Sequence, residues 1–131
     1  MVITNLINNA LIACVITSSR MEEVNLLEEK FFEMLAENLS NESKWFLVIL
    51  EQESPNHVNK ELLREKVNEL YSEIKKSEEL LINSRYVLDI HTARLEGAGL
   101  VKVERIGKVR MYSITDFGLK LIDYLENVQN N

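Results

Sequence analysis

Six basic residues within positions 84–114 are the side chains of this 131-residue sequence best suited to bind a charged partner. Only three acidic residues share that stretch, so its net charge is +3, whereas the whole chain carries −6. Positive charge confined to one segment of an acidic chain is typical of a surface that binds phosphate groups. The six residues are Arg85, Arg94, Lys102, Arg105, Lys108 and Arg110.

Motifs for catalysis or metal binding do not accompany these residues. The sequence has no Gly-rich phosphate loop, no H-E-x-x-H pair of metal ligands and no nucleophile elbow. The single cysteine, Cys14, lies in an apolar stripe, which favours a buried thiol over a nucleophile or a metal ligand. We therefore expect a protein that is not an enzyme and uses no cofactor, and we interpret His91 as a structural residue.

A helix and a β-hairpin must position the basic residues. The apolar spacing predicts a helix over 85–97, with Ser84 as its N-cap. After Gly99 the apolar period changes to two, which predicts strands over 100–105 and 109–113. The short loop 106–108 contains a glycine that can adopt positive φ, as a tight hairpin requires.

Helices are predicted on both sides of this unit. The helical ranges are 21–39, 41–53 with Ser40 or Asn41 as the cap, 60–82 with a possible interruption at Ser77, and 116–127. Residues 18–20 predict a break before the first of them. His57 and Val58 can form a short edge strand ahead of the helix that Asn59 caps.

The order of three helices followed by a hairpin is that of a winged helix-turn-helix, and three motifs strengthen the resemblance. Residues 91–101 (HTARLEGAGLV) resemble the end of the recognition helix in ArsR and PadR regulators, although Thr92 replaces an apolar residue of that pattern. Residues 105–108 (RIGK) resemble their basic wing tip, and 112–119 (YSITDFGL) resemble the motif that closes the wing in PadR and MarR proteins. The resemblance covers about residues 44–126 and implies a mainly helical fold with a small β-hairpin.

A winged helix of this kind places the start of its recognition helix in the major groove of DNA. The candidate base-reading residues are then Ser84, Arg85, Tyr86 and Asp89. Tyr86 could instead lie at the edge of the core. The candidate contacts to phosphates, or to the minor groove at the wing tip, are Arg94, Lys102, Arg105, Lys108 and Arg110.

The predicted organisation is a helical arm over 1–39, a winged-helix domain over 40–127 and a frayed tail over 128–131. Val2–Ile16 is amphipathic, too short and too polar to cross a membrane, and not preceded by the basic residues of a signal peptide. It can pack on its own domain or on a second chain, and Met21 could also be the native start. With 46% hydrophobic and 27% charged residues, the composition is that of a globular protein, which we expect in the cytoplasm.

The predicted function is sequence-specific binding of double-stranded DNA, by a homodimeric transcription regulator that uses the arm as its dimer interface. One alternative is a winged helix that docks another protein rather than DNA. Another is a replication or partition protein of a plasmid or virus.

Overall fold

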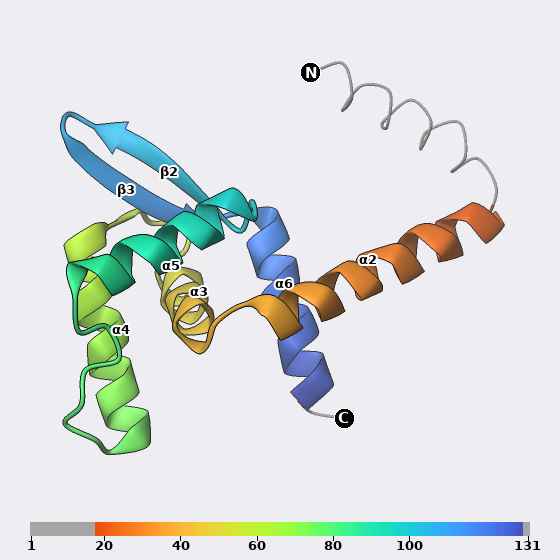
Figure 1. Cartoon of the computed structure of the whole chain (residues 1–131). Coiled ribbons are helices and arrows are strands. Elements are labelled where there is room, and N and C mark those ends of the chain that lie inside the picture. The colour runs from red at the N-terminus through yellow and green to blue at the C-terminus, as the bar shows by residue number, and fades with distance from the viewer. Residues whose placement is uncertain (1–17, 130–131) are drawn as a thin grey trace. The chain divides into compact units, whose positions relative to one another are not determined.

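The computed structural model describes residues 18–129, which Figure 1 shows in colour. The chain divides into two compact units after Glu37. The described part of the first unit is residues 18–37, which belong to the helix α2 (Ser18–Asn38). Residues 18–20 are helical, so the predicted break there is wrong; this segment contains neither Gly nor Pro to interrupt a helix. The prediction for Val2–Ile16 falls outside the described residues.

Three helices begin the second unit, and each begins at a polar cap that the sequence predicts. The hydroxyl of Ser40, the side-chain carbonyl of Asn59 and the hydroxyl of Ser84 each accept a hydrogen bond from the backbone N–H three residues later, at 3.1, 2.8 and 3.1 Å. These side chains satisfy backbone donors that a helix leaves unpaired at its start. The helices are α3 (Asn41–Glu53), α4 (Lys60–Lys75) and α5 (Arg85–Gly97).

The α4 helix ends close to Ser77, where the sequence analysis allows an interruption, but no helix resumes between there and Ile82. It ends at Lys75 because Lys76 adopts the left-handed conformation, with φ of 50°. The chain then reaches α5 through a connection anchored by Ile82, which is fully buried. The side-chain amide of Asn68 donates to the backbone carbonyl of Ile82 and accepts from its N–H, at 3.1 and 2.9 Å. Ile82 therefore contributes to the core from a loop rather than from a continuing helix.

The sheet has three antiparallel strands in the order β1-β3-β2. Ile106 pairs with Val109, so only two residues form the hairpin turn, and Gly107 takes φ of 65° there. At the turn, the first strand therefore extends one residue further than predicted, to Ile106, whereas the second begins at Val109 as predicted. The strands are β1 (Val58–Asn59), β2 (Val101–Ile106) and β3 (Val109–Ile114).

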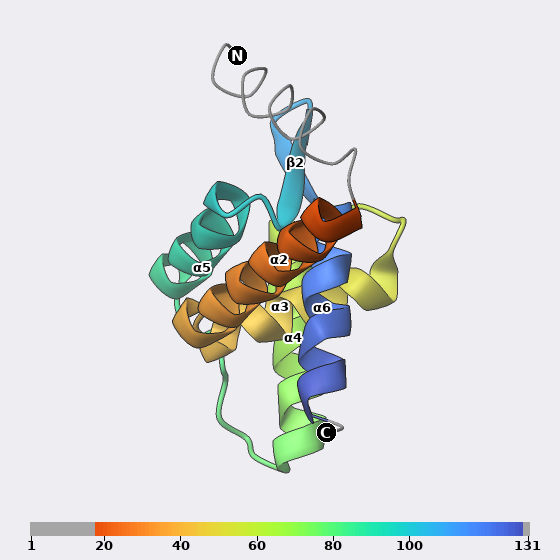
Figure 2. The same cartoon turned by 90° about the vertical axis from the view of Figure 1, so that its right-hand side faces the viewer.

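The core of the second unit surrounds α3, which packs against α4, α5, β3 and α6 (Asp116–Gln129). Figure 2 shows α5 and α6 on opposite sides of α3. The α6 helix includes Val128 and Gln129, which the sequence places in a frayed tail. Fully buried side chains come from every helix of the unit and from the sheet: Phe46, Leu47, Leu50, Leu63, Leu88, Leu95, Leu100, Tyr112 and Leu121.

The hairpin joins α6 through a tight corner. The hydroxyl of Thr115 donates to the carbonyl of Gly99 at 2.7 Å and accepts from the N–H of Gly118 at 3.0 Å. A Cβ at Gly118 would collide with the carbonyl oxygen of Leu100 and lie 2.7 Å from Cγ1 of Ile114. The fold is thus mainly helical with a small antiparallel sheet, as the sequence predicts.

Candidate nucleic-acid interface

The hairpin tip and the first turns of α4 and α5 lie on one side of the second unit (Figure 1). Between them lies a hollow of about 410 Å³ that is open to solvent. Four of its lining residues are basic and one is acidic, so it has an excess of positive charge. The lining residues are Asn59, Lys60, Glu61, Arg85, Lys108, Val109 and Arg110.

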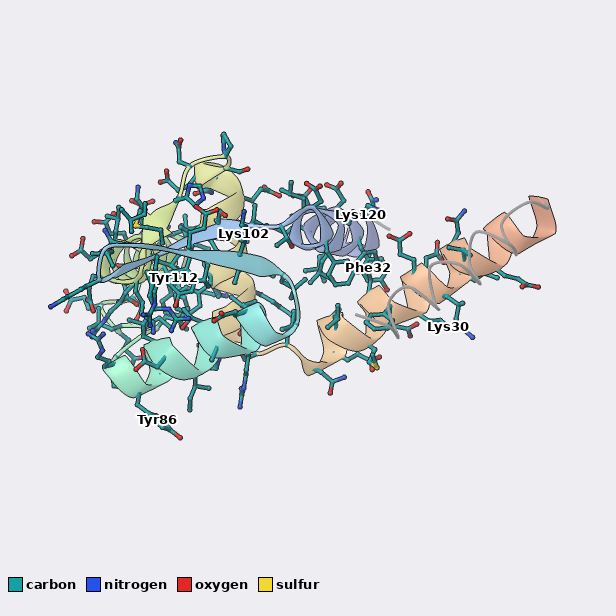
Figure 3. The ribbon with its side chains drawn as sticks, turned by 90° about the horizontal axis from the view of Figure 1, so that it is seen from above. Lys30, Phe32, Tyr86, Lys102, Tyr112 and Lys120 are labelled. Atoms are coloured by element: carbon teal, nitrogen blue, oxygen red, sulfur yellow. The ribbon has the colours of Figure 1, made fainter. Side chains whose placement is uncertain are left out.

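The first turn of α5 presents two of its predicted base-reading residues to solvent. Tyr86 is 73% exposed and points away from the domain (Figure 3), so the alternative that places it at the edge of the core is wrong. The side chain of Arg85 is 70% exposed. Ser84 is only partly exposed, and its hydroxyl is engaged as the helix cap. Arg85 and Tyr86 are therefore the accessible side chains at the start of this helix.

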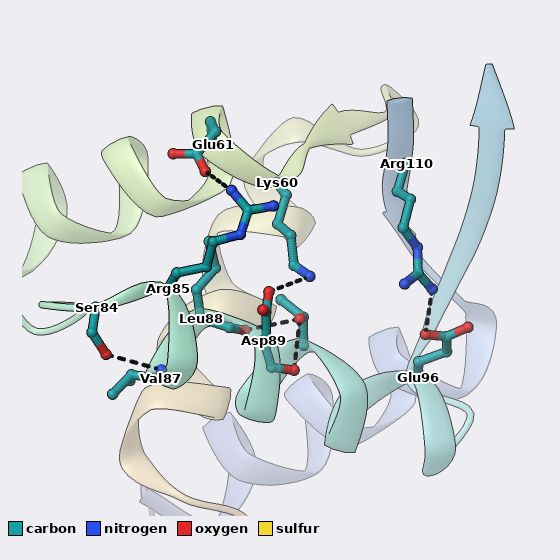
Figure 4. Close-up of polar contacts among 10 residues, drawn as sticks. Lys60, Glu61, Ser84, Arg85, Val87, Leu88, Asp89, Glu96 and Arg110 are labelled. Atoms are coloured by element: carbon teal, nitrogen blue, oxygen red, sulfur yellow. Dashed lines mark hydrogen bonds and ion pairs between the residues drawn. The ribbon is translucent and has the colours of Figure 1, made fainter. Parts of the chain in front are cut away.

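Arg85 and Asp89 each form an ion pair with the start of α4 (Figure 4). Nη1 of Arg85 lies 3.3 Å from Oε1 of Glu61. Nζ of Lys60 lies 2.6 Å from Oδ1 of Asp89, and this hydrogen bond lowers the pKa of Asp89. The sequence analysis missed Lys60 and Glu61, since 24 residues separate Glu61 from Arg85 and no local pattern connects them.

The strand register separates the basic residues of the hairpin. Arg105 pairs with Arg110, and Val103 pairs with the buried Tyr112, so both pairs project from the sheet face that meets the core. Lys102 projects from the opposite face, where its Nζ lies 2.8 Å from the carboxylate of Glu104. This hydrogen bond raises the pKa of Lys102 and lowers that of Glu104. Lys102 is thus separated from the hollow by the sheet.

Arg110, like Arg85, lines the hollow and has an acidic partner. Its Nη2 donates to Oε2 of Glu96 at 3.1 Å (Figure 4). Its Nε is buried and has no hydrogen-bond partner among the described residues. Within residues 18–129, Arg94, Arg105 and Lys108 form no ion pair. The hollow therefore combines two arginines held by carboxylates with the unpaired Lys108.

His91 lies on α5 and joins this helix to the start of α3. Its Nδ1 lies 2.8 Å from Oγ of Ser40, and its Nε2 lies 3.7 Å from Oε2 of Glu42. The side chain is 13% exposed, and this burial lowers the pKa of His91. These contacts agree with a structural role. No group of His, Cys, Asp and Glu that could hold a metal ion occurs within residues 18–129.

None of the described helices has the length and apolarity that crossing a membrane requires. The three helices and the hairpin define a winged helix-turn-helix protein, with a positive hollow beside the hairpin tip. No protein-family model matches the sequence.

The chain is 38% identical, over 112 residues, to the DNA-binding protein TubR of Bacillus cereus; the match covers 81% of this chain and 92% of that protein. The chain belongs to the TubR family. The resemblance to ArsR, PadR and MarR regulators is therefore correct for the winged-helix class, but the chain is not shown to be a member of those families. The relatives are DNA-binding proteins rather than enzymes.

A solved structure agrees with the fold. TubR from Bacillus thuringiensis serovar israelensis pBtoxis, bound to 24 bp of tubC, has a TM-score of 0.51 and 14% identity; the match covers 76% of this chain and 92% of that one. A second structure, of a type III plasmid segregation TubR, has a TM-score of 0.49 and 13% identity over 76% of this chain and 85% of that one.

Proposed function

We propose that this protein binds double-stranded DNA in a sequence-specific manner, with the start of α5 in the major groove and the hairpin against the adjacent backbone. The observation that carries the proposal is the positive hollow between α4, α5 and the hairpin tip, in a chain that is otherwise acidic. Kinship with a DNA-binding protein at 38% identity supports it.

The proposed contacts follow from where each side chain lies. Arg85 and Tyr86 are exposed at the start of α5, so they read base edges; arginine commonly binds guanine through two hydrogen bonds. Asp89 remains a candidate for a cytosine amino group, in competition with Lys60. Ser84 acts through the helix cap.

The phosphate contacts that we propose come from basic residues of α5 and of the hairpin, two of which, Lys108 and Arg110, line the hollow. They are Arg94, Arg105, Lys108 and Arg110. We leave Lys102 out of this surface because the register places it on the other face of the hairpin.

The protein acts, in our proposal, as a homodimer. Leu26 and Leu27 on α2 are 57% and 63% exposed, which a helix that packs only on its own domain would not require. Two-fold symmetry would present two α5 helices to successive turns of DNA and would match a palindromic or repeated site.

Plasmid segregation is the process that we assign to this binding, rather than transcription regulation. The reason is that a TubR structure is described as that of a plasmid segregation protein, and this chain belongs to the TubR family. A plasmid that encodes the Arg85→Ala variant should be lost from dividing cells at a higher rate than the same plasmid that encodes the wild-type protein. A change confined to transcript levels, with normal plasmid retention, would contradict this assignment.

Titrating labelled duplex DNA at increasing salt tests the binding itself. If each subunit places about four basic residues on phosphates, a dimer neutralises roughly eight, and the slope of log affinity against log salt is about −7. A protein-docking winged helix would bind duplex weakly at every salt concentration. Lack of binding at the lowest salt would overturn the proposed function.

A further inference from the structure

Two glutamates each hold one arginine of the proposed DNA surface. Glu61 of α4 contacts Arg85 of α5 at 3.3 Å, and Glu96 of α5 contacts Arg110 of β3 at 3.1 Å (Figure 4). The four side chains are 40–70% exposed. Because exposed ion pairs contribute little to folding, the fold does not require these carboxylates. Their position over the proposed DNA-contacting groups calls for another explanation.

A carboxylate and a phosphate compete for the same guanidinium. Both are anions that accept hydrogen bonds from the planar arginine side chain. When DNA approaches, its phosphate must displace the carboxylate and then remain close to a like charge. Base edges behave differently, since the guanine acceptors carry no net charge. A carboxylate beside an arginine therefore penalises contact with the backbone more than contact with a base.

We infer that Glu61 is a specificity-determining residue: it keeps Arg85 off the phosphates of unrelated DNA and leaves it available for base edges. This inference rests on the proposed function. Lys60 does not cancel the charge of Glu61, because Asp89 already holds Lys60 at 2.6 Å. Glu96 has a different effect in the same scheme. Because we assign its partner Arg110 to the backbone of any duplex, Glu96 should lower the affinity for all duplexes alike.

The test compares neutral variants on two DNA probes. One probe is a duplex of mixed sequence, and the other is a duplex that the wild-type protein selects from a random pool. Glu61→Gln should bind the mixed duplex roughly fivefold more tightly, the factor that corresponds to an exposed ion pair of full usual strength. It should gain less than about twofold on the selected duplex, so that discrimination falls. On the mixed duplex its salt slope should steepen by about 0.9, the value for one added phosphate contact.

Two further variants make the comparison interpretable. Glu96→Gln should tighten binding to both duplexes by the same factor. Glu53→Gln is the matched control for net charge, because Glu53 pairs with Lys66 at 2.5 Å between α3 and the middle of α4. It should change both affinities slightly and equally. Equal thermal unfolding temperatures would show that the variants fold alike.

Three outcomes would overturn the inference. A Glu61→Gln protein that behaves like Glu53→Gln would show that Glu61 does not restrain Arg85. Equal tightening of Glu61→Gln on both duplexes would reduce Glu61 to a general electrostatic effect. In both of these cases the proposed function would still stand, provided that the wild-type protein binds the selected duplex more tightly than the mixed one. Lack of duplex binding by every variant would overturn the proposed function and this inference with it.

Discussion

Arg85 is the residue on which sequence-specific recognition should depend most. It is exposed at the start of α5, and its Nη1 lies 3.3 Å from Oε1 of Glu61. In a DNA complex, a base edge can replace this carboxylate as the partner of Arg85. Arg85→Ala should cost about 1–3 kcal/mol of binding free energy on a selected duplex and little on mixed-sequence DNA. Fluorescence anisotropy titrations of both duplexes measure these losses.

Lys108 provides the control for Arg85. It lines the same hollow from the hairpin turn, and we assign it to the DNA backbone. Lys108→Ala should therefore weaken binding to both duplexes by a similar factor and make the salt slope less steep by about 0.9. Equal losses on both duplexes for Arg85→Ala would remove Arg85 from the base-reading residues.

His91 makes folding stability depend on pH. Burial, together with Arg94, lowers the pKa of His91 below its ordinary value, and the attraction of Glu42 opposes this shift without reversing it. The unfolded chain therefore binds a proton more readily than the folded chain. We expect the contribution of His91 to the free energy of unfolding to be fully present above its unfolded pKa of about 6.5 and to be lost as the pH drops through its folded pKa.

Urea unfolding of the wild-type protein and of His91→Gln, between about pH 7.5 and pH 5.5, measures this contribution. The wild-type protein should lose more stability over this interval than the variant does. The variant retains a side chain that can bond Ser40 but cannot become charged. Parallel losses in the two proteins would show that His91 does not cause the pH dependence.

At the scale of secondary-structure elements, the corner between β3 and α6 depends on a residue without a side chain. Gly118→Ala would place a Cβ against the carbonyl of Leu100 and the side chain of Ile114. We expect a loss of about 1–3 kcal/mol in the free energy of unfolding, as overpacking usually causes. The midpoint of denaturant unfolding measures it.

Gly97 provides the matched control for Gly118. A Cβ at Gly97 would meet nothing within 4 Å, and the residue is the last of α5. Gly97→Ala should leave the stability unchanged or raise it slightly, because alanine restricts the unfolded chain more than glycine does. Equal destabilisation by both substitutions would contradict the role assigned to the corner.

At the scale of the whole molecule, we predict self-association, because a dimer would present two α5 helices to the same DNA. The intact protein should sediment as a dimer at about 20 micromolar, a concentration at which an interface of modest strength is occupied. Replacing both Leu26 and Leu27 with glutamate should shift it towards monomer, because charge on the proposed apolar interface must be desolvated.

Leu80 serves as the control for this experiment, since it is 56% exposed on the connection between α4 and α5. Leu80→Glu should leave the sedimentation unchanged. A monomeric wild-type protein at the same concentration would exclude the proposed dimer.

The sequence by itself determined the elements of this protein and the class of fold. The caps at Ser40, Asn59 and Ser84 are local signals, because each side chain bonds a backbone N–H only three residues away. The change of apolar period after Gly99 is equally local. Sequence reasoning allowed an interruption near Ser77 but missed the loop that follows it, where hydrogen bonds between Asn68 and Ile82, 14 residues apart, stabilise a non-helical connection.

Only the tertiary structure decided which charges meet. The acidic partner of Arg85 lies on α4 and that of Arg110 on α5, and Lys60 is brought to Asp89 by the packing of α4 beside α5. A count of charges shows an excess of +3 over residues 84–114 but cannot tell which arginines are already paired. Pairing depends on distances of a few ångströms between side chains far apart in the sequence, and these distances are set by how the buried faces of the helices pack.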